Sequence, residues 1–247
     1  DQAVEVFTSS ADLNEEGLET QIAVGGLFRR RGGIERAIRM HQNLVDRPGI
    51  NQKQREKARF ALAEDFFSAG LLDRAEDLYL QLRGTSEHRV TALRRLLRIC
   101  EITAEWDRAV DLCGELLRIG ADTVPPGQLA HYYCELAEEA RRKGDWKEAR
   151  RLLQQAEVVE PGKVRCTIFR GDLAADQGQV VAAAAAYAEV ARAAPAMLGD
   201  ILPRLLRTVP QAALEPLLQE VTATPEGLRG IALAVIRDPQ ISHPAAI

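Results

Sequence analysis

An alanine recurs five times along this chain with the same kind of neighbours, at Ala37, Ala75, Ala109, Ala149 and Ala183. Each has a glycine or, once, another alanine five positions earlier and a bulkier residue four positions later. Consecutive copies are 38, 34, 40 and 34 residues apart, and a sixth, earlier copy fits Ala3 with Phe7. A near-constant period of this length predicts a tandem array of helical hairpins that bury one continuous core.

The apolar residues between the alanines follow the helical period. Val24, Leu27 and Phe28 stand at i, i+3 and i+4, and Gly25 allows a second helix to approach closely. Gly32 then ends the first helix, because glycine accepts the left-handed backbone that a helix terminus requires. A helical hairpin with a period near 34 residues is the tetratricopeptide repeat (TPR). The sequence therefore predicts an all-α TPR solenoid with the recurring alanine where two helices cross.

The repeats have definite expected bounds. We expect a single TPR superhelical array over residues 1–247, with a partial repeat at 1–14 and TPR repeats at 15–50, 51–88, 89–124, 125–162 and 163–196, followed by degenerate, truncated helical repeats at 197–247. Helices are expected over 198–209, 211–222 and 225–237, with prolines as punctuation. Because the chain starts at Asp1 inside a second helix and lacks a polar closing helix, we expect it to be a piece of a longer protein.

The composition and motifs of this sequence argue against a catalytic or metal site within it. No Ser/His/Asp constellation, paired-carboxylate motif or phosphate loop is visible, so a non-enzymatic role is predicted. The four cysteines are widely spaced and form no CxxC pair, which argues against a local metal site and fits a reducing compartment. No cofactor is therefore expected in this fragment. No apolar run approaches the length of a membrane span, so the fragment is expected to be soluble.

Charge is unevenly distributed although the net charge is only −4. Residues 1–28 hold six acids and no base, whereas residues 29–59 hold ten Lys/Arg against three acids. Such a basic segment fits nucleic acid, a membrane surface or simply solvated helix faces. Aromatic residues make up only 5% and are needed in the core, which leaves few stacking platforms for single strands. We therefore expect solvated faces and no nucleic acid.

The first helix of each TPR pair lines the concave groove, and its inward positions here are rich in arginine. An arginine-rich wall suits acidic or carboxylate-bearing peptide segments. A second recurrence, Glu35-Arg36, Asp73-Arg74 and Asp107-Arg108, precedes the alanine, and it fits either a ladder of salt bridges between repeats or a row of binding arginines. Predicted protein-binding residues are Arg29, Arg30, Asp73, Arg74, Arg94, Arg98, His131 and Arg141.

Several blocks carry a more specific resemblance. The stretches 26–32 with 36–42, 69–71 with 73–77, 105–106 with 109–111, and 130–137 (Ala-His-Tyr-Tyr-Cys-Glu-Leu-Ala) resemble the lipopolysaccharide assembly protein B family. The similarity covers about residues 1–195 and is loose beyond them. That resemblance implies a bacterial inner-membrane protein facing the cytoplasm, with an N-terminal membrane anchor, a TPR array and a C-terminal rubredoxin-like domain that holds iron or zinc.

The resemblance also implies a role. Members of the family restrain lipopolysaccharide synthesis as an adaptor that presents the deacetylase LpxC to the membrane protease FtsH, under a membrane protein that senses lipopolysaccharide. The anchor and metal domain have no counterpart in this sequence, so neither function is assigned to a residue here. Three alternatives stay open: a chaperone-type TPR clamp for peptides, an RNA-associated helical scaffold, and assembly as a homodimer.

Overall fold

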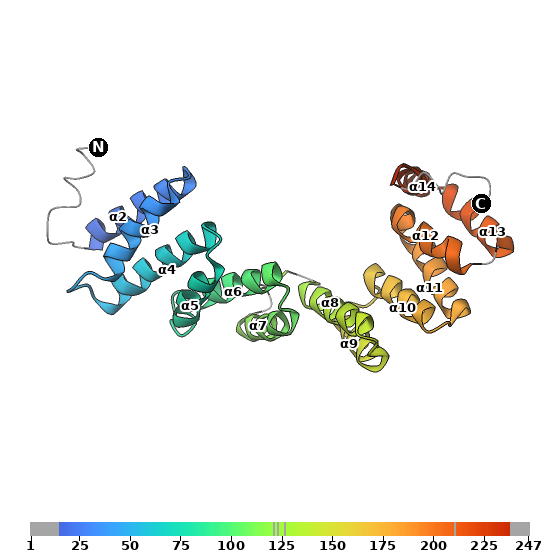
Figure 1. Cartoon of the computed structure of the whole chain (residues 1–247), viewed down its shortest axis with the longest axis horizontal. Coiled ribbons are helices and arrows are strands. Elements are labelled where there is room, and N and C mark those ends of the chain that lie inside the picture. The colour runs from blue at the N-terminus through green and yellow to red at the C-terminus, as the bar shows by residue number, and fades with distance from the viewer. Residues whose placement is uncertain (1–14, 121, 123, 126, 210, 238–247) are drawn as a thin grey trace. The chain divides into compact units, whose positions relative to one another are not determined.

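The computed structural model describes residues 15–120, 122, 124–125, 127–209 and 211–237. Within those ranges every regular element is helical (Figure 1). The all-α TPR architecture is therefore confirmed. The helix expected around Ala3 to Phe7, in the partial repeat 1–14, lies outside the described residues.

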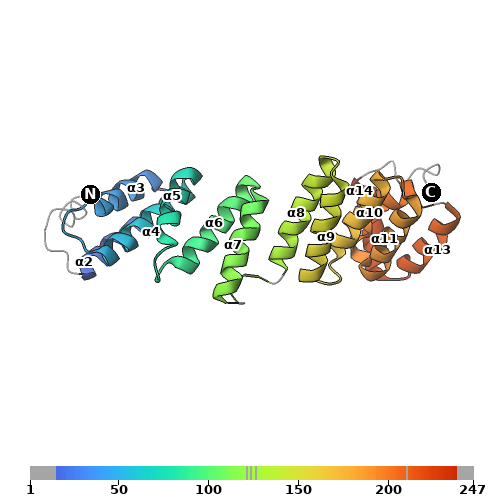
Figure 2. The ribbon, with the colours of Figure 1, turned by 90° about the horizontal axis from the view of Figure 1, so that it is seen from below.

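The chain divides into two compact units, residues 1–123 and 124–247. The first holds three helix pairs: α2 (Glu15–Arg30) with α3 (Ile34–Val45), α4 (Gln52–Ser68) with α5 (Leu72–Leu82), and α6 (Arg89–Thr103) with α7 (Trp106–Ile119). The second begins with α8 (Gln128–Arg142) and α9 (Trp146–Val159), then α10 (Val164–Asp176) and α11 (Val180–Ala193). Figure 2 shows successive hairpins side by side within each unit. The continuity of one array over residues 1–247 stays a prediction.

Each hairpin turn has the same backbone. A residue just after the first helix has a positive φ: Gly32 (+84°), Gly70 (+74°), Gly144 (+77°) and Gly178 (+72°), each two positions after the helix, and in the third repeat Ala104 (57°), one position after it. The following residue then donates its N–H to a carbonyl five residues back, as from Leu71 to Phe66 at 2.9 Å. This bond satisfies a carbonyl that the helix end leaves free. The glycine spacing therefore marks the hairpin turns as predicted.

The five recurring alanines are all buried, with side chains at most 1% exposed. Small residues also recur on the facing helix. A Cβ added at Gly25 would collide with the ring of His41, and one at Gly171 would lie 2.5 Å from Cε1 of Tyr187. The first helix therefore accommodates a ring of the second helix at each of these two glycines, while the recurring alanine of the second helix adds little bulk at the crossing.

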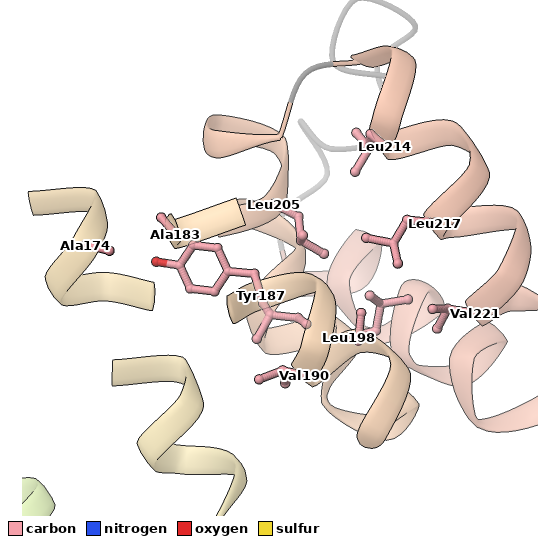
Figure 3. Packing of buried hydrophobic residues seen from close by; sticks show 11 residues of the cluster. Ala174, Ala183, Tyr187, Val190, Leu198, Leu205, Leu214, Leu217 and Val221 are labelled. Atoms are coloured by element: carbon pink, nitrogen blue, oxygen red, sulfur yellow. The ribbon is translucent and has the colours of Figure 1, made fainter. Parts of the chain in front are cut away.

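The last part of the second unit contains a short 3₁₀ turn, η2 (Pro195–Met197), then α12 (Leu198–Thr208), α13 (Gln211–Thr222) and α14 (Pro225–Arg237). The three helices confirm the expected segments. Tyr187 of α11, Leu205 of α12 and Leu217 of α13 belong to one core cluster, part of which Figure 3 shows. This shared core explains why helices persist here although the repeat pattern weakens.

The prolines of this region correct one expectation. Pro203 and Pro216 do not end helices but lie inside α12 and α13. Proline removes one helical hydrogen bond and strains the turn before it. Burial of Ile201, Leu202 and Leu205 on α12 offsets that cost, because most helix stability in proteins comes from packing.

Candidate partner-binding surface

A charged network joins the second and third repeats of the first unit. Arg95 of α6 donates through Nε and Nη2 to both oxygens of Glu64 on α4, each at 2.6 Å. The hydroxyl of Tyr79 on α5 donates to the same carboxylate at 2.7 Å. Burial, reinforced by that hydrogen bond, holds the pKa of Tyr79 above its usual value. The network therefore fixes these three side chains against one another and leaves the Glu64 carboxylate few acceptor positions for a binding partner.

Arg29 is held in a second, deeper network. Its Nη1 donates to Oδ1 of Asp65 at 2.7 Å, and Asp65 is fully buried. Nδ1 of the buried His41 lies 2.5 Å from the other Asp65 oxygen, and its Nε2 is 3.2 Å from the carbonyl of Ile22. The charge of Arg29 is therefore balanced inside the protein, and only 20% of its side chain is exposed.

Arg30, Arg94 and Arg98 present a different picture, because all three are exposed. Arg30 lies in the last turn of α2 and forms no ion pair with any residue that the structure describes. Nη1 of Arg98 donates to Glu101 of its own helix at 2.9 Å, but the arginine side chain remains 59% exposed. Ion pairs this exposed contribute little to stability. These guanidinium groups can therefore exchange water or a weak partner for a stronger one.

The recurring acid–arginine pairs have two different environments. The guanidinium carbons of Arg36 and Arg74 stand 4.1 Å from the ring centroids of Phe28 and Phe66, within the same hairpin. The third repeat has Cys100 at the ring position, and Arg108 instead pairs with Glu76 of the preceding repeat and with Glu105. Within the described part of the chain, a salt bridge between repeats is thus found at the third of these three copies and not at the first two. Asp73 and Arg74 are both exposed, so partner binding there stays a prediction.

In the second unit both predicted residues are internally engaged. Nδ1 of His131 lies 3.0 Å from Nη1 of Arg165, and Nη2 of Arg165 donates to Glu135. Arg141 donates to Glu138 of its own helix and to Asp176 of the next repeat. Each therefore links α8 to α10, although His131 keeps 38% of its side chain exposed.

Three acids that were not among the predicted binding residues have a structural role. Glu64, Glu138 and Asp172 each stand six positions before the turn residue, and each accepts from an arginine. Asp172 repeats the pattern of Glu64, since the hydroxyl of Tyr187 donates to it at 2.6 Å and Nε of Arg204 at 2.7 Å. The sequence feature that could have revealed these networks is the recurring acid, which two of these repeats combine with a tyrosine four positions after the alanine.

No helix of the described residues is both long and apolar enough to cross a membrane. No group of three or more His, Cys, Asp or Glu side chains in the described ranges is arranged to hold a metal ion.

The TPR geometry agrees with comparisons to known proteins. A tetratricopeptide repeat family model matches residues 134–197. Lipopolysaccharide assembly protein B of Escherichia coli (strain K12) is 35% identical over 179 residues, which are 72% of this chain and 46% of that protein. The chain belongs to the lipopolysaccharide assembly protein B family. The family member of Haemophilus influenzae is 33% identical over 210 residues, 82% of this chain and 52% of that protein.

The chain thus spans about half the length of these members of the lipopolysaccharide assembly protein B family. Among solved structures, MamA (AMB-1) is similar with a TM-score of 0.45 and 14% sequence identity, over 72% of this chain and 92% of MamA.

Proposed function

We propose that this chain is the TPR part of a non-enzymatic adaptor that restrains lipopolysaccharide synthesis by presenting LpxC to FtsH. The observation that carries the proposal is the 35% identity to lipopolysaccharide assembly protein B over 72% of the chain. The adaptor acts at the cytoplasmic face of the bacterial inner membrane and responds there to a membrane sensor of lipopolysaccharide. Membrane attachment and the rubredoxin-like iron or zinc site belong, in this proposal, to parts of the protein outside this sequence.

The surface proposed for LpxC is the exposed arginine face of the first unit, defined by Arg30, Arg94 and Arg98. Planar guanidinium groups form oriented, charge-assisted hydrogen bonds to carboxylates, which suits an acidic segment of a partner. The internally paired Arg29 and Arg141 are assigned a supporting role, because each is already bonded to a carboxylate of another helix. His131 is assigned the same supporting role, because Arg165 and Glu135 flank it.

A general TPR clamp for acidic peptide tails is the second candidate, and the same exposed arginines favour it. The RNA scaffold has less support, because the basic segment 29–59 uses several of its charges internally. Arg29 pairs with Asp65, Arg36 stacks on Phe28, and Nζ of Lys57 donates to Glu19 at 2.7 Å. Assembly as a homodimer is compatible both with the adaptor for LpxC and FtsH and with the general TPR clamp.

Binding to purified LpxC tests the proposal. The double variant Arg94→Ala with Arg98→Ala removes two exposed cations, and we expect about tenfold weaker binding, since a lost charged hydrogen bond is worth about that much. The melting temperature of each variant is measured alongside, so that a loss of binding is distinguished from a loss of stability. Arg151→Ala is the matched control, because Arg151 is 54% exposed and its hydrogen bonds to Glu148 and Gln155 lie along its own helix.

The outcomes separate the candidates. Unchanged LpxC binding by the double variant moves the site away from this surface. Absence of LpxC and FtsH binding by the parent chain, together with capture of acidic peptide tails, supports the general clamp. Capture of RNA that high salt abolishes supports the scaffold, and turnover of a small substrate would contradict all three.

A further inference from the structure

Two cysteines of consecutive repeats meet inside the second unit. Cys134 lies on α8 and Cys166 on α10, and their sulfurs are 3.5 Å apart. Both side chains are buried, at 0% and 1% exposure. Thirty-two positions separate them in the chain, so this proximity is a product of the packing between repeats.

The surroundings make the two thiols unequal. The hydrogen bond from the Cys134 thiol stabilises the Cys166 thiolate and holds the pKa of Cys166 below its usual value, although burial opposes this. The same contact, together with burial, raises the pKa of Cys134. The positive charge of Lys163 acts on both sulfurs in the direction of the thiolate. Cysteine reactivity follows thiolate character, so Cys166 is the more nucleophilic sulfur.

We propose that Cys134 and Cys166 form an oxidisable thiol pair, which a hydroperoxide converts into a disulfide that joins α8 to α10 across a repeat boundary. The Cys166 thiolate attacks the peroxide, the O–O bond breaks, and Cys166 becomes a sulfenic acid while hydroxide leaves and takes a proton to form water. Cys134 then attacks the sulfenic sulfur, an S–S bond forms, and the second hydroxide leaves with the Cys134 proton as water. Two thiols thus lose two electrons in total, and one hydrogen peroxide is reduced to two waters.

The geometry requires only a small movement. The sulfurs must approach by about 1.5 Å to reach the roughly 2.05 Å bond of a disulfide. Each repeat of a solenoid contacts only its neighbours, so transient separation of α8 from α10 can admit a peroxide. The disulfide then prevents that separation.

The other two cysteines provide an internal comparison. Cys100 and Cys113 of the first unit are equally buried, at 1% and 0% exposure. Burial raises the pKa of each to about 11. Neither has a second thiol within hydrogen-bonding distance among the described residues. Burial alone therefore predicts equal behaviour of all four cysteines, whereas the proposal predicts that only one pair cross-links.

The test is limited oxidation of the 247-residue chain with hydrogen peroxide, followed by alkylation in denaturant and peptide mapping by mass spectrometry. We expect a cross-link between the peptides that contain Cys134 and Cys166, with loss of two hydrogens and complete reversal by a thiol reductant. Cys100 and Cys113 should remain free thiols during oxidation and should therefore be alkylated afterwards. The oxidised chain should also melt at a higher temperature, and reductant should abolish the increase.

Three variants complete the design. Cys166→Ala and Cys134→Ala should each abolish the cross-link, whereas Cys100→Ala should retain it at the parent yield. Full alkylation of Cys134 and Cys166 after oxidation overturns the proposal, and so does oxidation to sulfinic acid without a cross-link. An equal yield of this cross-link in denaturant also overturns it, because the native packing would then have no part in the reaction.

Discussion

Ala104 is the residue that departs most clearly from the rule of its own array. It stands at the turn position that glycine occupies in the other four hairpins, and its backbone is left-handed, with φ 57° and ψ 34°. A side chain in this conformation costs roughly 1–2 kcal/mol, because Cβ approaches the following carbonyl. The third repeat therefore carries a local strain that the glycine-containing repeats avoid.

Ala104→Gly is expected to stabilise the chain. Relief of the left-handed strain exceeds the greater flexibility of glycine in the unfolded state, so we expect a gain of about 0.5–1 kcal/mol. Denaturant unfolding measures it. The reverse change, Gly70→Ala, should lose about 1–2 kcal/mol, and no described atom beyond the neighbouring backbone lies within 4 Å of the added Cβ to complicate that result. A destabilised Ala104→Gly variant would contradict the backbone argument.

At the scale of the helices, charged side chains connect consecutive hairpins. Glu115 of α7 accepts from Arg83, which follows α5, and from Nη2 of Arg89 at the start of α6, the latter at 3.2 Å. The hydrogen bond from Arg83 is the largest cause of a lowered Glu115 pKa, burial opposes it, and Arg89 lowers it further. One carboxylate thus holds together the end of one repeat and both helices of the next.

The lowered pKa has a pH consequence. Because the folded pKa lies below the unfolded value, the contribution to stability is present above the unfolded pKa and is lost as pH falls through the folded pKa. We expect Glu115→Gln to cost up to about 1 kcal/mol at pH 7, and this difference from the parent should disappear in acid. Urea unfolding between pH 7 and pH 3 measures it. A cost of Glu115→Gln that is the same at pH 3 as at pH 7 would contradict this role of the carboxylate.

At the scale of the whole molecule, we expect each of the two compact units to unfold as one cooperative unit. Solenoid stability is close to a sum of repeat and nearest-neighbour terms, so units can unfold in separate steps. Ala75 and Ala183 are both fully buried at helix crossings, one in each unit. A larger side chain at either position overpacks only the hairpins around it.

Ala75→Leu and Ala183→Leu should each cost about 1–3 kcal/mol. Hydrogen exchange read by mass spectrometry should show faster exchange throughout residues 15–120 for the first variant and throughout 127–209 for the second. A loss of protection spread equally over both units by either variant would mean that the chain unfolds as one cooperative body.

The sequence by itself determined the features that depend on local backbone conformation and on period. The glycine spacing located the hairpin turns, and the alanine spacing located the helix crossings, because both requirements act within one hairpin. The segments after residue 196 were also recognisable as helices. The family followed from blocks of residues that generic repeats do not share.

Only the tertiary structure decided the partners of the charged and thiol side chains. Arg29 was expected to face a partner, yet it reaches Asp65, 36 positions away on the next repeat. The thiol pair of Cys134 and Cys166 spans a repeat boundary in the same way. Such pairings depend on how one hairpin is rotated against the next, and that rotation results from the packing of many side chains. Local propensity and periodicity do not determine that rotation.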